Sequence, residues 1–165
     1  MEEKIGVIKE KFAGAAIEQL SGMIEFYQSD NRSGVQKEIE KAHKKLEALE
    51  KEKARTEALW KYEREYGAYT YICGIDEVGR GPLAGPVVAG AVILPKDCDI
   101  LYINDSKKLS EKKREELYDV IMEKAVAVGL GYATPERIDE INILQATYEA
   151  MRAAIKNMGI MPDIL

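Results

Sequence analysis

Two adjacent carboxylates, Asp76 and Glu77, stand at the end of an apolar segment of the chain. Carboxylate oxygens are the hard ligands that Mg²⁺ and Mn²⁺ prefer. Such ions promote phosphoryl transfer, because one ion makes hydroxide from water and a pair stabilises charge on the entering and leaving oxygens. Adjacent residues of a regular strand point to opposite faces, so both side chains can serve one site only if the strand ends beside them. Val78-Gly79 permits that break, although an acidic pair alone is also typical of a surface turn.

The residues after the acidic pair, Gly79-Arg80-Gly81, place a long cation between two residues that lack side chains. Glycine lets backbone N–H groups approach a ligand closely, and the guanidinium fork of arginine fits phosphate. Pro82 and Gly85-Pro86 stiffen the turn that follows. The spacing does not match the dinucleotide-binding fingerprint G-x-G-x-x-G. A tight hairpin turn would explain the glycines, but it would not explain an acidic pair directly before them.

The formal net charge of −5 argues mildly against a nucleic-acid partner, because phosphate binding usually leaves a basic footprint. A carboxylate metal site contributes negative charge, however, and the basic surface can be local. One run is rich in cations, namely Lys107, Lys108, Lys112, Lys113 and Arg114. A solvated helix start explains this cluster as well as a phosphate-binding face does.

The length of 165 residues favours one domain with an appendage. The first residues do not resemble a signal peptide, and the longest apolar run, Val87 to Leu94, is too short to span a bilayer and is typical of a buried strand. Cys73 and Cys98 lack the spacing of a disulfide framework or a metal site. We therefore expect a cytoplasmic protein that has no membrane association and keeps both thiols reduced.

The residues before Tyr66-Gly67 predict helices. An apolar stripe recurs at alternating spacings of four and three along one long helix, and Lys and Glu fill the other faces. The stripe consists of Val35, Ile39, Ala42, Leu46 and Leu49 and continues through Leu59, Trp60 and Tyr66. With a shorter stripe upstream, this pattern predicts a helical hairpin or small bundle over residues 1–68. We interpret this extension as a packing or solubility appendage rather than an arm that grips nucleic acid or a partner, and its lone His43 as inert.

The sequence after residue 68 alternates strand and helix signals. Runs of β-branched residues predict strands at 69–75, 86–94 and 126–132. Helices are expected to start after Ser110, Thr134 and Asn142, whose side chains can accept hydrogen bonds from the first turn. The predicted buried stripe of the last helix is Leu144, Tyr148, Met151, Ile155 and Met158. These signals indicate a mixed α/β domain over residues 69–165, and Asp163-Ile164-Leu165 looks like the opening of a further strand, so we expect a domain that is cut short.

Three long stretches identify a family. Residues 71–165 resemble ribonuclease HII through GIDEVGRGPLAGPVV at 74–88, DSKKLS at 105–110 and IDEINILQAT at 138–147. The preceding helical segment, including Gly34-Val35-Gln36, is similar to the extension of some bacterial members. The resemblance implies a ribonuclease-H-like mixed sheet with flanking helices. It also implies hydrolysis that depends on Mn²⁺ or Mg²⁺, acting on RNA in RNA–DNA hybrids and 5′ of ribonucleotides in duplex DNA, with a 3′-hydroxyl and a 5′-phosphate as products.

The resemblance also implies roles for single residues. Asp76 and Glu77 would be catalytic metal ligands. Gly79, Arg80 and Gly81 would read the 2′-hydroxyl at an RNA–DNA junction, the group that distinguishes RNA from DNA. Phosphate would be held by Ser106 and Lys107. Asn142 would lie near the site, although a helix-capping role fits it equally well.

The sequence departs from the family pattern at its C-terminal end. The family uses four carboxylates, and the third and fourth, with a tyrosine that stacks at the junction, would follow residue 165. Asp163 precedes the strand that should carry the third carboxylate, so it does not replace it. We therefore expect weak metal binding, little activity and possible self-association of this chain. A non-catalytic nucleic-acid-binding or interaction fragment stays open as an alternative, as does another nuclease or transposase of the same superfold, although Gly79-Arg80-Gly81 favours ribonucleotide recognition.

Overall fold

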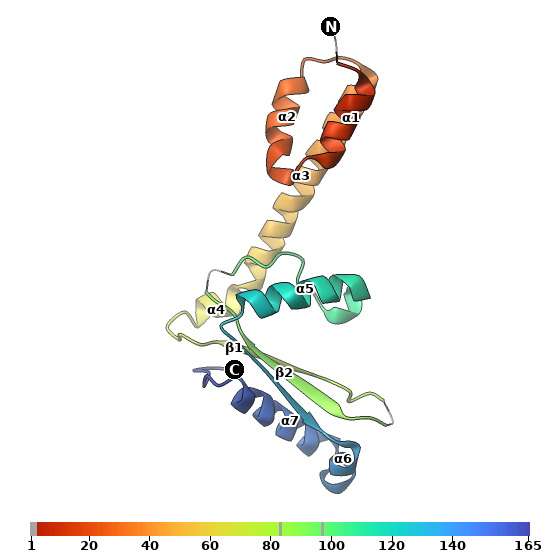
Figure 1. Cartoon of the computed structure of the whole chain (residues 1–165). Coiled ribbons are helices and arrows are strands. Elements are labelled where there is room, and N and C mark those ends of the chain that lie inside the picture. The colour runs from red at the N-terminus through yellow and green to blue at the C-terminus, as the bar shows by residue number, and fades with distance from the viewer. Residues whose placement is uncertain (1–2, 83, 97) are drawn as a thin grey trace. The chain divides into compact units, whose positions relative to one another are not determined.

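The computed structural model describes residues 3–82, 84–96 and 98–165 (Figure 1). The chain divides into two compact units, and the division falls between Ala58 and Leu59. The long predicted helix spans that division as α3 (Ser33–Leu59). The expected domain boundary between residues 68 and 69 stays a prediction.

In the N-terminal unit, α1 (Ile5–Gly14), the short 3₁₀ helix η1 (Ile17–Gln19) and α2 (Leu20–Tyr27) pack against the first part of α3. They enclose an apolar core to which the two predicted stripes contribute Leu20, Tyr27, Val35, Ile39 and Ala42, while α1 adds Ile8 and Phe12, which neither stripe included. The helical extension expected from the sequence is therefore confirmed. The Tyr27 hydroxyl donates to Glu3 Oε2 over 2.6 Å, and Arg32 Nη1 donates to the Glu3 carbonyl over 2.8 Å. These bonds fasten the chain before α1 to the turn between α2 and α3.

The long helix does not continue through Trp60 to Tyr66 as the stripe predicts. It ends at Leu59, and a separate short helix, α4 (Lys61–Glu65), follows. At Trp60 the backbone ψ is 15°, outside the helical range. The Trp60 side chain packs against the cluster of Cys98, Ile100 and Leu117, and burial of the large indole favours this break over continuation of an exposed stripe.

The C-terminal unit is built on three antiparallel strands in the order β1 (Cys73–Val78), β2 (Val87–Ile93) and β3 (Ala127–Ala133). The second and third strands agree with the predicted ranges to within one residue at each end. The first was predicted at 69–75 and lies further along the chain. The shift is caused by a contact between residues far apart in the sequence. The Asp163 carboxylate accepts the backbone N–H groups of Thr70 and Tyr71 over 2.9 and 2.8 Å. These amides are thus bonded outside the sheet.

The end of the chain pairs with the segment before β1. Ile164 forms a parallel bridge with Ile72, and the Cys73 N–H donates to the Ile164 carbonyl over 3.0 Å. The expectation that Asp163-Ile164-Leu165 opens a further strand is therefore confirmed at one bridge. The antiparallel sheet with its flanking helices gives the mixed α/β arrangement that the sequence predicts.

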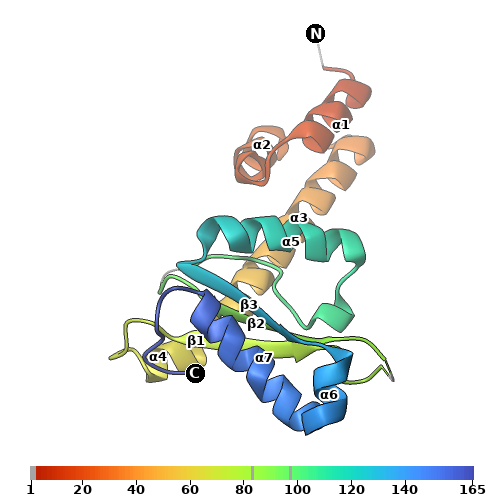
Figure 2. The ribbon, with the colours of Figure 1, turned by 60° about the horizontal axis from the view of Figure 1, so that its bottom comes forward.

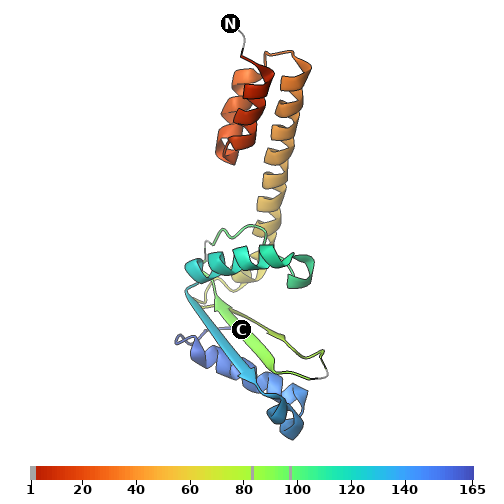
Figure 3. The ribbon, with the colours of Figure 1, turned by 45° about the vertical axis from the view of Figure 1, so that its right-hand side comes forward.

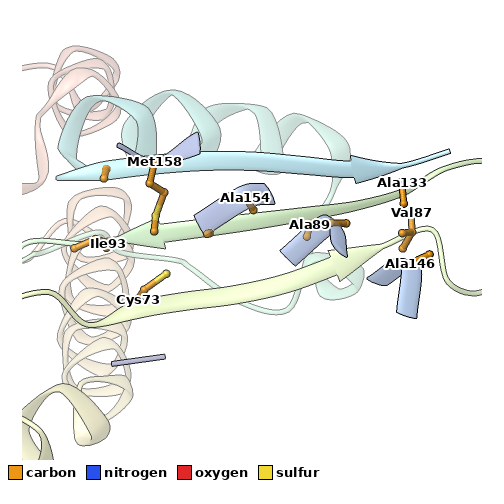
Figure 4. Close-up of a cluster of buried hydrophobic side chains, with 11 residues drawn as sticks. Cys73, Val87, Ala89, Ile93, Ala133, Ala146, Ala154 and Met158 are labelled. Atoms are coloured by element: carbon orange, nitrogen blue, oxygen red, sulfur yellow. The ribbon is translucent and has the colours of Figure 1, made fainter. Parts of the chain in front are cut away.

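One face of the sheet is covered by α7 (Ile143–Asn157). Figure 4 shows the buried residues of both layers meeting there, with Ala146 beside Val87 and Ala133. The predicted buried stripe of this helix is wrong in part, since Leu144 and Tyr148 are 43% and 44% exposed. The fully buried positions are instead those of small or short side chains: Ala146, Thr147, Ala150 and Ala154.

Two glycines of β3 explain why only small residues fit under α7. A Cβ added to Gly129 would lie 2.1 Å from the Ala154 carbonyl oxygen, and one added to Gly131 would lie 2.1 Å from that of Ala150. The helix backbone thus rests directly on the strand. Large side chains at the contact line would hold the two layers apart.

The opposite side of the sheet carries α5 (Glu111–Lys124). Leu117 of α5 packs with Cys98, Ile100 and Leu94, and Leu94 continues the alternation of β2 on the side away from α7. Figures 2 and 3 show the sheet between α5 and α7. No helix of the described residues is long and apolar enough to cross a membrane.

The three predicted helix starts are confirmed. Ser110 Oγ accepts the Lys113 N–H and Thr134 Oγ1 accepts the Arg137 N–H, each over 3.3 Å, at the starts of α5 and α6 (Pro135–Ile141). Asn142 Oδ1 accepts two N–H groups at the start of α7, over 3.1 and 3.2 Å. Asn142 has a φ of 71° and a ψ of 162°, a backbone conformation that residues other than glycine rarely adopt, and this turns the chain between α6 and α7.

Candidate nucleic-acid cleavage site

Asp76 and Glu77 both lie inside β1, just before its last residue, Val78. β1 ends at Val78, where the sequence permits a break, but Val78 still pairs with Val88, so Asp76 and Glu77 both lie within regular strand. Alternation along the strand places Glu77 on the α7 side with Cys73, and it places Asp76, which is exposed, on the other. In this structure the two carboxylates do not share a face.

The two carboxylates also differ in their partners. Glu77 Oε1 is 3.5 Å from Arg80 Nη1, and the Glu77 side chain is 22% exposed. Asp76 Oδ1 accepts the backbone N–H of Glu77 over 2.9 Å. Among the acidic residues of the three strands, all of them described, Asp76 alone faces the side of α5. This exposed carboxylate is the acidic group that a ligand can reach there.

The glycines after β1 fall into two kinds. Gly79 has a φ of 101°, and an added Cβ would lie 2.3 Å from the Pro86 carbonyl oxygen, so this position requires glycine to close the hairpin. Gly85 has a φ of 122°. Gly81 has no positive φ, and an added Cβ would meet nothing within 4 Å. Turn geometry therefore explains Gly79 and Gly85 but leaves Gly81 without a packing reason.

Ser106 and Lys107 lie in the short 3₁₀ helix η2 (Ser106–Lys108), and both are exposed. Asp105 Oδ1 accepts the Lys107 N–H over 3.0 Å. Arg114 Nη1 donates to the carbonyls of Leu109 and Ser106 over 2.7 and 3.3 Å. The loop is thus held from both sides, and its polar side chains face solvent.

The cations of the basic cluster are not equally available. Arg114 is bonded to the loop carbonyls, and Lys113 pairs with Glu116 and lies over the Tyr102 ring. Within the described part of the chain, Lys107, Lys108 and Lys112 are exposed and form no ion pair. These three ammonium groups are available to an external anion.

Two family models match the chain. The model described as Ribonuclease HII matches residues 73–165, and the model of its N-terminal domain matches residues 4–67. The chain belongs to the ribonuclease HII family. It is 63% identical over 144 residues to ribonuclease HII of Lachnoclostridium phytofermentans, a match that covers 87% of this chain and 57% of that protein. It is 56% identical over 139 residues to a ribonuclease HII of Bacillus cereus, and this match covers 82% of this chain and 54% of that protein.

The chain spans about half the length of the curated relatives it matches. Among solved structures, ribonuclease H2 from Pyrococcus horikoshii OT3 is 29% identical. That superposition has a TM-score of 0.45 and covers 57% of this chain and 48% of the other.

The carboxylates of this ribonuclease HII chain are the type of ligand that a hard divalent cation prefers. Among the described residues, however, too few of them lie together to hold one. Asp76 and Glu77 offer carboxylate oxygens, yet they lie on opposite faces of β1. In the described ranges, no three His, Cys, Asp or Glu residues come together as a possible metal site. Asp76 is thus suited to contribute one ligand on the α5 side, while Glu77 would have to leave Arg80 and turn across the strand to join it.

Cross-strand neighbours of Asp76 form a surface that sequence reasoning did not single out. Asp76 pairs with Gly90, which pairs with Leu130, while Val78 pairs with Val88, which pairs with Tyr132. The signal was present in the segment AVGLGYA of β3, where small residues alternate with large ones. Its meaning depends on strand register, which a single sequence does not give.

Proposed function

We propose that this ribonuclease HII chain carries part of the active site of a metal-dependent endoribonuclease. The reaction is hydrolysis of RNA in RNA–DNA hybrids and cleavage 5′ of a ribonucleotide embedded in duplex DNA. The observation that carries the proposal is the exposed carboxylate of Asp76 followed by a hairpin whose Gly81 has no packing reason. A glycine that the fold does not require is expected where a ligand comes close to the backbone.

Each residue of the site would have its own task. Asp76 and Glu77 are the proposed ligands of Mn²⁺ or Mg²⁺, which when bound supplies a reactive hydroxide and neutralises phosphate charge. The backbone of Gly79 and Gly81 is positioned to approach the 2′-hydroxyl, with Arg80 as a phosphate partner.

On the α5 side, Ser106 and Lys107 would bind a substrate phosphate, because both are exposed on a loop held rigid by Asp105 and Arg114. Asn142 already caps α7 through its side-chain oxygen. A substrate contact of Asn142 stays a prediction.

Cleavage under single-turnover conditions tests the proposal. The 165-residue chain in excess is mixed with a labelled duplex that contains one ribonucleotide, in Mn²⁺ and separately in Mg²⁺, and the ends of the products are mapped. Slow cleavage 5′ of the ribonucleotide, with a matched all-DNA duplex left intact, is the expected result. Asp76→Asn should lower the rate by at least about a hundredfold, since even outer-shell changes at metal sites cost about 10–100-fold. Equal cutting of both duplexes would contradict ribonucleotide recognition.

A second candidate function is a non-catalytic nucleic-acid-binding module. It is favoured by one observation, namely that Asp76 and Glu77 lie on opposite faces of β1. Binding of the duplex without cleavage in either metal, with a Kd that Asp76→Asn leaves unchanged, would support this second function.

The proposed partner is an RNA–DNA hybrid or a DNA duplex that contains ribonucleotides. We also infer a cytoplasmic location, because Cys73 and Cys98 are buried and unpaired, as expected in a reducing compartment. The self-association expected for this chain is tested by sedimentation over a range of concentrations.

A further inference from the structure

The side of the sheet away from α7 carries a row of exposed side chains beside Asp76. Val78, Leu130 and Tyr132 are 69%, 60% and 70% exposed. Together with Asp76 and Gly90 they form what we call the Asp76 face. Cross-strand partners lie about 5 Å apart. Leu130 is two strands away from Asp76, and Tyr132 is two strands away from Val78, so each of these distances is roughly 10 Å.

Gly90 occupies the position between Asp76 and Leu130, and no neighbour requires a glycine there. An added Cβ would meet only Leu130 Cδ2, at 3.7 Å, which is an ordinary contact. Glycine inside a strand weakens it and often marks close approach of a ligand or another backbone. The contrast with Gly129 and Gly131, which contact the backbone of α7, shows that packing explains glycine on one side of this sheet only.

The Asp76 face lies on the same side of the sheet as the available cations. Packing of Leu94 against the cluster that contains Leu117 of α5 places α5 on that side. In Figures 1 to 3, the end of α5 that follows η2 lies toward the end of the sheet where β1 stops. Lys112 lies in the first turn of α5, and Lys107 and Lys108 lie in η2 just before it.

We propose that Gly90, Leu130 and Tyr132 are a nucleic-acid contact surface, on which a sugar–phosphate backbone crosses Gly90 beside Asp76 and a sugar or base packs on Tyr132. Tyrosine suits this task because its ring is apolar and its hydroxyl can bond to phosphate. The inference rests on the proposed function and extends it to residues with no assigned role.

Charge favours nucleic acid over a protein segment as the occupant. A protein layer over this face would bury the Asp76 carboxylate, which has no cationic partner among the described residues, at a large desolvation cost. A phosphate chain is attracted by the three available lysines, and it brings counterions or metal to Asp76.

Fluorescence anisotropy in EDTA measures binding without cleavage. A ribonucleotide-containing duplex and a matched all-DNA duplex are titrated with the 165-residue chain, with Tyr132→Ala and with Tyr148→Ala. Tyr148 is the matched control, because it is an exposed tyrosine on α7, on the opposite side of the sheet. Tyr132→Ala should raise the Kd about five- to tenfold, as expected for the loss of one aromatic contact, and Tyr132→Phe should retain most of the affinity. Tyr148→Ala should bind like the unchanged chain.

Three outcomes would overturn the inference. An unchanged Kd for Tyr132→Ala removes the nucleic-acid contact while leaving the proposed function in place. A lower melting temperature or an altered sedimentation coefficient for Tyr132→Ala, with an unchanged Kd, shows that protein covers the face instead. Failure of the unchanged chain to bind either duplex overturns the proposed function and this inference with it.

Discussion

Residue sizes differ between the two faces of the three-stranded sheet, although the same strands form both. On the α7 side, Ala89, Ala91, Gly129 and Gly131 meet a helix that contributes Ala146, Ala150 and Ala154, and residue size is set by contact of two backbones. On the Asp76 face, large residues stand exposed beside a carboxylate and a glycine that has room for a side chain. Packing thus explains the residue types of one face, and the proposed nucleic-acid contact would explain those of the other.

Replacing one glycine on each face tests this contrast most directly. Gly131→Ala puts a Cβ 2.1 Å from the Ala150 carbonyl oxygen and 2.5 Å from the Ala154 nitrogen, both backbone atoms of α7. The helix must move off the strand, so we expect a loss of about 3 kcal/mol in the free energy of unfolding. Urea denaturation followed by circular dichroism measures it.

Gly90→Ala is the matched substitution on the Asp76 face. Its free energy of unfolding should stay within about 0.5 kcal/mol of the unchanged chain, because the new methyl group has space. Equal destabilisation by the two substitutions would show that the Asp76 face is packed as tightly as the other.

The hairpin after β1 contains the same contrast, between a glycine that the fold requires and a glycine that it does not require. Gly79→Ala combines a φ of 101° with a Cβ 2.3 Å from the Pro86 carbonyl oxygen, and it should cost about 2 kcal/mol of stability. Gly81→Ala should leave stability unchanged but lower single-turnover cleavage of a ribonucleotide-containing duplex about tenfold, the effect of one lost hydrogen bond. Thermal melts of both variants, beside the cleavage assay, separate the two roles. If Gly81→Ala melts early and cleaves normally, the 2′-hydroxyl contact is refuted.

Local signals predicted much of this fold. The caps Ser110, Thr134 and Asn142 depend on side chains next to the turns they stabilise, so a single sequence reveals them. The strand ends and the buried face of α7 were missed where distant residues decide. Asp163 takes the amides of Thr70 and Tyr71, and the β3 glycines select small residues on the helix.

The residues of the candidate site likewise divide into those that the sequence reveals and those that only the structure brings together. Asp76 and Gly81 were found by motif, because their types and order along the chain carry the signal. Gly90 and Tyr132 were not found, because their proximity to Asp76 arises only from the pairing of three strands. The placement of Asp76 and Glu77 on opposite faces likewise follows from where β1 ends, which depends on its partner strand.

The smallest expected effect concerns the packed side, where Arg137 joins α6 to α7. Arg137 donates to both Glu149 oxygens over 2.9 and 2.6 Å, and this hydrogen bonding lowers the pKa of Glu149 below its ordinary value of 4.5. A carboxylate with a lowered folded-state pKa stabilises the protein fully above its ordinary pKa, and the contribution is lost as pH falls through the folded-state value. The pair is partly exposed, with side chains 43% and 41% accessible, so solvent weakens the effect.

Melting temperatures of Glu149→Gln and the unchanged chain should therefore differ slightly at pH 7 and converge as pH falls below about 4.5, the ordinary pKa of the carboxyl group. Glu140→Gln is the control, because the Glu140 side chain is 63% exposed and its Oε2 accepts a single hydrogen bond, from Arg137 Nη1, among the described residues. A gap between Glu149→Gln and the unchanged chain that stays constant down to about pH 3 would show that Arg137 and Glu149 stabilise α7 through packing of their side chains. The packed side of the sheet would then depend on contact alone, with no electrostatic support at the junction of α6 and α7.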